Sequence, residues 1–165
     1  IEELLASPVP NHIILMGYVI GGVVRGLMVG LIVTLLSLFF TDLSIQHYFI
    51  TIFTVLVTAI LFSLGGFINA VFARSFDDIS IVPTFVLTPL TYLGGVFYSM
   101  NQLDPIWQKI SLLNPIVYMV NAFRYGILGS SDVNVTASLS AISVFCVLMY
   151  VFAYRLLARG TGMRE

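Results

Sequence analysis

Charged residues are scarce in this sequence, at 9% of 165 positions, whereas hydrophobic residues make up 59%. Soluble domains carry roughly 25% charged residues, and the mean hydropathy of +1.03 is strongly apolar. The net charge is -1, and no basic stripe is present that could neutralise phosphates, which excludes nucleic-acid binding. The composition therefore predicts a protein that lies in a lipid bilayer.

Cysteine and histidine are also few. The single cysteine, Cys146, lies in an apolar run and cannot form an internal disulfide, so we interpret it as inert packing. His12 and His47 lie outside the expected spans and on opposite sides of the membrane, which leaves no pair for zinc or for a serine triad. The sequence therefore predicts neither a metal site nor a catalytic centre.

Four apolar segments are long enough to cross the bilayer, because about 20 helical residues span a hydrocarbon core of roughly 30 Å. They cover about residues 13–40, 48–73, 79–100 and 136–154. A further apolar stretch, 110–123, has about 14 residues, is interrupted by Asn114-Pro115 and is too short to cross, so we expect a re-entrant helical hairpin over about 103–129. The predicted fold is an all-α membrane protein with four transmembrane helices and this hairpin, forming one transmembrane domain over residues 1–165.

No Asp or Glu falls inside any of these four segments, whereas ion-coupled transporters usually place acidic residues at the membrane midplane. No Gly-x-x-x-x-Gly-Lys-Ser/Thr sequence occurs either, so the chain cannot itself cradle nucleotide phosphates. Coupling to an ion gradient is disfavoured, and we expect a partner chain to handle any ATP.

Lys and Arg are distributed unevenly between the two sides of the membrane. With four spans, one side carries Arg74, Arg155, Arg159 and Arg164. The loop at 41–47 has no Lys or Arg, and the other outer segment has only Lys109 and Arg124. The positive-inside rule therefore predicts that the start of the chain and its C-terminus are cytoplasmic and that the hairpin faces outward.

The first span carries glycines at four-residue spacing. Gly22, Gly26 and Gly30 share one helix face, along which a second backbone could approach closely. Two interpretations stay open, namely packing within the protomer and a homodimer seam.

Arg25 is a formal charge inside the first span, and a charge in hydrocarbon costs at least a few kcal/mol without a cavity or a partner. It is therefore a candidate functional residue. The alternative is a side chain that snorkels toward the cytoplasmic interface.

Polar and small residues recur at helical spacing in the third span, namely Thr84, Thr88, Thr91, Gly95 and Tyr98. The second span has a similar face, formed by Thr51, Thr54, Thr58, Gly65 and Asn69. One interpretation is a substrate path lined by Thr84, Thr88, Thr91, Tyr98 and Arg25. The other is interhelical hydrogen bonding, with repair of the backbone groups freed by Pro83 and Pro89.

Several pieces of the second half carry a family resemblance. In order, they are Pro89-Leu90-Thr91-Tyr92-Leu93-Gly94-Gly95-Val96-Phe97-Tyr98, Leu103-Asp104-Pro105-Ile106-Trp107, Leu113-Asn114-Pro115 and Asn121-Ala122-Phe123-Arg124-Tyr125-Gly126. Their order and spacing resemble the signature of ABC-2 type permeases, the membrane subunits of bacterial ATP-binding-cassette exporters. The likeness extends over nearly the whole chain, which would be the C-terminal two-thirds of such a permease.

The resemblance implies a multi-pass protein of the bacterial inner membrane that has six spans, of which this chain would hold the third to the sixth. Two short helices would enter from the outside before the last span, and Pro105, Asn114, Pro115 and Arg124 match this hairpin signature. The implied partners are a second permease copy, as a homodimer, and a separate ATPase that binds ATP and Mg²⁺. The chain itself would be no enzyme and would bind no cofactor.

The opening segment at 1–11 resembles the cytoplasmic loop in which a coupling helix docks into the ATPase. Its acidic residues beside a Leu pair, before a Pro, would make a short amphipathic element with apolar anchors. The expected coupling residues are Glu2, Glu3, Leu4, Leu5, Ser7 and Pro8.

The resemblance implies ATP-driven export of a hydrophobic, drug-like, polysaccharide or lipid substrate. The main alternative is a membrane anchor or assembly subunit that does not transport, and it predicts that the Thr stripe tolerates bulky replacements. A gradient-driven transporter is a third possibility, provided that a preceding part of the protein supplied the acidic residues.

Overall fold

The computed structural model describes residues 10–41, 44–73 and 75–159. The helices in these ranges are, in order, α2 (Asn11–Ser37), α3 (Tyr48–Phe72), α4 (Phe76–Ile81), the π-helix η1 (Val82–Leu87), α5 (Thr88–Tyr92), the 3₁₀-helix η2 (Met100–Gln102), α6 (Pro105–Ser111), α7 (Pro115–Leu128) and α8 (Val135–Ala158). No strand occurs in this described part of the chain. The predicted all-α class is therefore confirmed.

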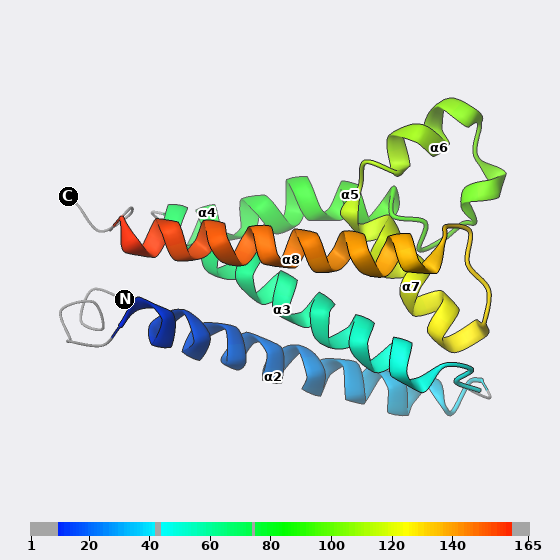
Figure 1. Ribbon diagram of the computed structural model, residues 1–165, viewed down its shortest axis with the longest axis horizontal. Helices are drawn as coiled ribbons and strands as arrows, with labels where there is room; N and C mark the ends of the chain where they lie inside the picture. The colour runs from blue at the N-terminus through cyan, green and yellow to red at the C-terminus, as the bar shows by residue number, and fades with distance from the viewer. Residues whose placement is uncertain (1–9, 42–43, 74, 160–165) are drawn as a thin grey trace.

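Three of the described helices, α2, α3 and α8, are long and apolar enough to cross a membrane. Their 27, 25 and 24 residues each exceed the roughly 20 residues that a hydrocarbon core requires. Figure 1 shows α2, α3 and α8 running along the long axis, with the two ends of the described chain at the same end of the molecule.

The expected span at 79–100 has a different form. Its helical part begins at Phe76 and ends at Tyr92, and it consists of α4, η1 and α5 in direct succession. Residues beyond Tyr92 turn away because Gly95 has a φ of 75°, a left-handed conformation that glycine adopts without strain. The prediction of one helix over about 79–100 is therefore wrong at its end, and the segment is shorter than each of the three long helices.

Two prolines account for the π-helix within this segment. Pro89 has no N–H, and its ring displaces the carbonyl that it would face in an α-helix. The backbone N–H of Thr88 bonds to the carbonyl of Pro83, five residues earlier, as in a π-helix. The helix therefore widens here and does not end.

The α6–α7 pair breaks at Asn114, which lies in extended backbone and is 5% exposed. Its Oδ1 accepts a hydrogen bond from the N–H of Ile116 at 3.0 Å and so caps α7. Its Nδ2 donates to the carbonyl of Leu90 at 2.6 Å, which ties the break to α5. The helix α7 packs against α3 and α8, and Figure 1 shows α6 at the end of the molecule opposite the termini.

The core lies between the long helices and α7. One buried cluster joins α2, α3 and α8 through Leu15, Leu64 and Leu157, and a second joins α3, α7 and α8 through Leu61, Met119 and Ile142. Neither cluster contains a residue of α4, η1 or α5. Hydrogen bonds attach that segment near its two ends, where Asn69 Nδ2 donates to the carbonyl of Ile79 at 2.7 Å and Asn114 reaches Leu90. Space therefore remains between this segment and α2.

Candidate functional site

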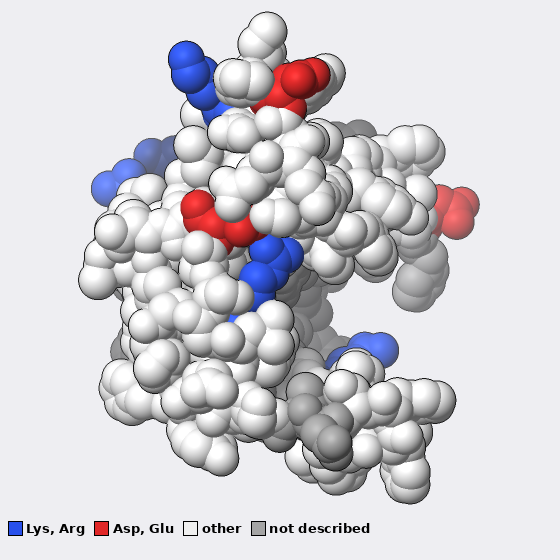
Figure 2. All heavy atoms as spheres, turned by 90° about the vertical axis from the view of Figure 1, so that its right-hand side faces the viewer, with Lys and Arg blue, Asp and Glu red and all other residues white. Residues whose placement is uncertain are grey.

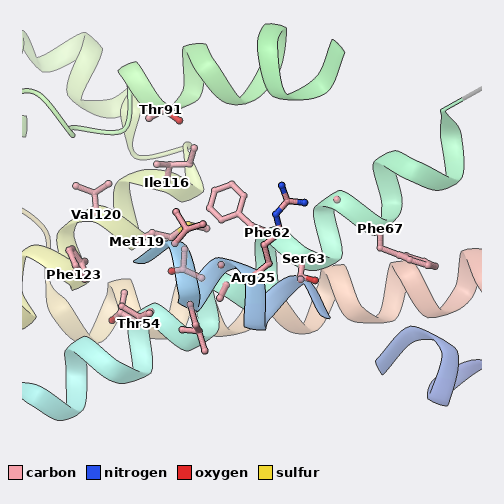
Figure 3. Close-up of a pocket in the computed structure, with 18 of the residues that line it drawn as sticks. Arg25, Thr54, Phe62, Ser63, Phe67, Thr91, Ile116, Met119, Val120 and Phe123 are labelled. Atoms are coloured by element: carbon pink, nitrogen blue, oxygen red, sulfur yellow. The ribbon is translucent and has the colours of Figure 1, made fainter. Parts of the chain in front are cut away.

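A cavity of about 930 Å³ lies among α2, α3, α5 and α7. Figure 3 shows side chains from these helices around it, including Arg25 from α2, Thr54 from α3 and Thr91 from α5. Figure 2 shows the molecule from the end that carries α6, where a notch separates an upper lobe from a lower one. The volume falls in the range of roughly 300 to 1,000 Å³ that is typical of small-molecule sites.

Most of the wall of this cavity is apolar. The aromatic and large apolar residues that line it include Phe62, Phe67, Phe123, Ile116, Met119 and Val120. Because phenylalanine and methionine offer large, polarisable surfaces, such a wall suits a hydrocarbon or an aromatic ligand.

Two threonine hydroxyls of α3 face this apolar wall without a partner. Thr54 and Thr58 are one helical turn apart, both line the cavity, and Thr54 is 1% exposed. Their Oγ1 atoms are buried and form no hydrogen bond with the described residues. A buried hydroxyl without a partner costs about 1 to 3 kcal/mol. Because both Oγ1 atoms are covered by surrounding atoms, a group in the cavity would reach them only after these side chains change rotamer.

Arg25 lies near the middle of α2. At 1.5 Å per residue it is roughly 21 Å from the start of this helix, so a membrane-spanning α2 would hold it near the bilayer centre. No described residue forms an ion pair or a hydrogen bond with Arg25. In Figure 3 its guanidinium points into the open space below the helix that carries Thr91. This position argues against a side chain that snorkels to the cytoplasmic interface.

The predicted path residues are only partly brought together. Arg25 and Thr91 line the cavity, whereas Thr84, Thr88 and Tyr98 do not. The hydroxyl of Thr88 donates to the carbonyl of Pro83 at 3.0 Å, and that of Thr91 to the carbonyl of Leu87 at 2.8 Å. Neither carbonyl is one that a proline leaves free; the carbonyl four residues before Pro83, that of Ile79, accepts from Asn69 Nδ2 of α3 at 2.7 Å, which is the predicted interhelical repair.

Tyr98 lies in the loop after α5, and its hydroxyl is buried without a partner among the described residues. The predicted substrate path consisted of residues of the third span together with Arg25. It did not include Thr54 and Thr58, although their one-turn spacing in the second span was visible in the sequence.

The glycines of α2 differ in their surroundings. A Cβ added at Gly22 would collide with the Oγ and Cβ of Ser63, and one at Gly26 would lie 3.9 Å from the Cβ of Ala59. At Gly30 and Gly17 no atom of the described residues would lie within 4 Å. Gly22 and Gly26 therefore pack against α3 of the same chain, and no described residue covers the face at Gly30.

A second polar group, which we call the Asp132 cluster, joins Asp132 and Arg124 to Ser99 and the backbone of Gly95 and Met100. Arg124 Nη1 lies 3.0 Å from Asp132 Oδ2, and its Nη2 donates to the carbonyl of Gly95 at 2.6 Å. Asp132 also accepts from the Ser99 hydroxyl, at 2.9 and 2.8 Å, and from the Met100 N–H, at 2.8 Å. The cluster fastens the loop after α5 to α7 and to the α7–α8 connection.

The pKa of Asp132 is the net result of opposing influences. Burial acts to raise this pKa, but the hydrogen bonds from Met100 and Ser99 and the charge of Arg124 together lower it below its ordinary value of 3.8. Asp132 is therefore ionised at neutral pH, and its charge-assisted bonds are the stronger kind.

The four residues of the predicted hairpin signature lie at the starts of two helices, at the break between them and in the Asp132 cluster. Pro105 and Pro115 begin α6 and α7, where the missing N–H costs nothing, Asn114 forms the break, and Arg124 belongs to the Asp132 cluster. The role of Arg124 depends on Asp132, which the sequence reading did not single out. The predicted coupling residues Glu2, Glu3, Leu4, Leu5, Ser7 and Pro8 lie outside the described residues.

Comparison with known families gives a match over most of the chain. Residues 1–128 match the family described as ABC-2 type transporter. No solved structure matches the chain.

Among curated proteins, the inner membrane transport permease YadH of Escherichia coli strain K12 is 56% identical over 165 residues, which are 100% of this chain and 64% of YadH. Nodulation protein J of Neorhizobium galegae is 28% identical over 103 residues, 62% of this chain and 39% of that protein. Nodulation protein J of Rhizobium leguminosarum bv. viciae is 25% identical over 103 residues, 62% of this chain and 40% of that protein. The chain thus spans 64% of the length of the YadH proteins that it matches, which is less than two thirds.

Proposed function

This chain belongs to the ABC-2 type transporter family, and we propose that it is part of the membrane permease of an ATP-driven exporter in a bacterial inner membrane. The observation that carries the proposal is the family match over residues 1–128, which include all of the described helices except α8. The 56% identity to a protein named an inner membrane transport permease supports it.

In this proposal α4, η1 and α5 together cross the membrane, in addition to the three long helices α2, α3 and α8. The α6–α7 pair is a re-entrant hairpin on the outer side. Figure 1 supports this arrangement, because the chain returns along the long axis after α3 and the start of α2 and the end of α8 lie at one end. Arg155 and Arg159 lie in or next to the last turn of α8, and Lys and Arg concentrate on the cytoplasmic side of such proteins. That end would be cytoplasmic, and the Asp132 cluster would face outward.

The proposed partner is a separate ATPase that binds ATP and Mg²⁺ and contacts the segment of Glu2, Glu3, Leu4, Leu5, Ser7 and Pro8. A Leu pair flanked by acidic residues is suited to a groove on a partner. Closure of the ATPases would press on this segment and move α2, which follows it in the chain. The permease would act as a homodimer whose seam lies away from Gly22 and Gly26, since α3 already covers them.

The test uses the full-length protein, purified from native membranes in a mild detergent. We expect an ATPase subunit to copurify with it, and we expect the substitutions Leu4→Asp and Leu5→Asp together to release that subunit. The matched control is the same pair of changes at Phe39 and Phe40, which are 84% and 89% exposed just beyond the opposite end of α2. The control should keep the ATPase bound.

Two outcomes would count against the proposal. If no ATPase copurifies with the unaltered protein, the result favours the alternative of an anchor or assembly subunit. If the ATPase stays bound to the Leu4 and Leu5 variant, the coupling segment lies elsewhere, even though the exporter function could stand. Measuring ATP-dependent export by vesicles that carry each variant separates these two cases.

A further inference from the structure

The large cavity combines an apolar wall with one cation that no described residue neutralises. Resting on the proposed function, we infer that this cavity binds an anionic amphiphile, with the anion at Arg25 and the hydrocarbon on the phenylalanine and methionine side chains. The substrate class would accordingly be a molecule with a negatively charged head group and an apolar body.

The position of Arg25 supplies the first argument. Near the middle of a helix that spans the membrane, its charge costs at least a few kcal/mol unless an anion or water reaches it. The three long described helices contain no Asp or Glu, so none of them can supply the anion. A ligand that brings its own negative charge into this cavity would satisfy Arg25.

The packing of α2 on α3 gives the second argument, because it fixes the heights of the polar groups. Gly22 faces Ser63 and Gly26 faces Ala59, so the two helices run antiparallel in a defined register. In this register Thr58 lies close to the level of Arg25, and Thr54 lies one turn farther toward the α6 end. Of the two threonines, Thr58 is thus the nearer in height to Arg25.

A head group at Arg25 would lie near the level of Thr58 but not of Thr54, which is roughly 9 Å farther along the helix axis. Thr54 is 1% exposed, and its Oγ1, like that of Thr58, has no partner among the described residues. The guanidinium of Arg25 has five N–H donors, which match the oxygens of a phosphate, sulfate or carboxylate group. The apolar wall opposite, which includes Phe62 and Met119, requires that this head group carry a hydrocarbon part.

The experiment uses the full-length protein in nanodiscs of phosphatidylcholine and two photoreactive probes. One probe is an alkyl sulfate that carries a diazirine in its chain, and the other is the uncharged alcohol with the same chain. After irradiation, mass spectrometry measures labelling of the peptides that contain Phe62 and Met119. The variants are Arg25→Gln, which removes the charge, and Arg25→Lys, which keeps it.

We expect the sulfate probe to label these peptides in the wild type and in Arg25→Lys, and roughly tenfold less in Arg25→Gln, as for the loss of a charge-assisted hydrogen bond. The alcohol should label all three proteins equally, which also shows that the cavity is intact. Equal labelling of Arg25→Gln by the sulfate would overturn the inference. So would the absence of labelling in the wild type, because the rest of the protein would then cover the cavity.

If the alcohol also labels Arg25→Gln less than the wild type, this variant has lost the cavity. The inference is then tested by competition in the wild type alone. There, a plain alkyl sulfate should displace the photoreactive sulfate at about one-tenth of the concentration that a zwitterionic amphiphile of the same chain requires. Equal concentrations would contradict the inference. None of these labelling measurements depends on the ATPase. A negative result here is therefore distinct from a negative result in the copurification test of the proposed function.

Discussion

Asp132 and Arg25 are both charged residues of this helical protein, and their surroundings are opposite. Asp132 accepts hydrogen bonds from Ser99 and the Met100 N–H and pairs with Arg124 at 3.0 Å. Arg25 has no partner among the described residues, and the Thr54 and Thr58 hydroxyls beside the same cavity have none either.

The difference separates a polar group that holds the fold from one that is free to bind. In the Asp132 cluster, every charge is compensated within the chain, so the cluster fixes the loop after α5 and leaves no capacity for a ligand. Around the cavity, donors stay unsatisfied in an apolar setting, which is costly for folding and favourable for recognition. Stability measurements should therefore respond strongly to changes in the first region and weakly to changes in the second.

The largest effect should come from Asp132→Ala. This change leaves Arg124 without its carboxylate and the Met100 N–H without its acceptor, and we expect it to lower the free energy of unfolding by about 3 kcal/mol. Unfolding of the full-length protein by urea in an uncharged detergent measures the loss. Asp104→Ala is the control, since Asp104 is exposed and makes no capping bond, and it should change stability by less than about 0.5 kcal/mol. Equal losses for the two variants would contradict the role of the cluster.

The edge of the cavity can be probed at Gly22, where α2 touches α3. A methyl group there would overlap Ser63, so Gly22→Ala should cost about 1 to 3 kcal/mol through overpacking. The same change at Gly30 meets no atom within 4 Å, and it should be neutral or slightly stabilising because alanine favours helix. A cost at Gly30 as large as that at Gly22 would instead indicate a second copy of the chain packed on that face.

Acid should weaken the Asp132 cluster without touching the cavity. Because the folded pKa of Asp132 lies below 3.8, the unfolded chain takes up the proton first as the pH falls. The stabilising contribution of Asp132 is therefore complete above about pH 5 and is lost as the pH drops below 3.8 toward the folded pKa. The difference in unfolding free energy between the wild type and Asp132→Asn, measured across this range, should shrink. A difference that stays constant down to about pH 3 would mean that the charge does not matter.

The smallest effect on stability should come from Thr54→Val. Its hydroxyl has no described partner, so its removal should leave the unfolding free energy within about 0.5 kcal/mol or raise it. The matched change at a satisfied hydroxyl is Ser99→Ala, which removes the bonds to Asp132 and should cost about 1.5 to 3 kcal/mol. A loss for Thr54→Val as large as that for Ser99→Ala would show that another part of the full-length protein already binds this hydroxyl.

The sequence by itself determined the class of the molecule and most of its long helices. Length and apolarity are local properties, and the requirement that backbone groups be satisfied in lipid leaves helix as the form of such runs. Hence α2, α3 and α8 lie within a few residues of the expected ranges. The break at Asn114-Pro115 was equally visible, because the geometry of proline acts on its immediate neighbour.

Only the tertiary structure decided which polar residues meet. Composition could not show that the helix containing Pro83 and Pro89 widens into a π-helix and ends at Tyr92, since both depend on how freed backbone groups find partners. Nor could it show that Arg124 pairs with Asp132 whereas Arg25 stays unpaired. Charge pairing and burial depend on distances between segments far apart in the chain, and these distances arise only when the helices pack.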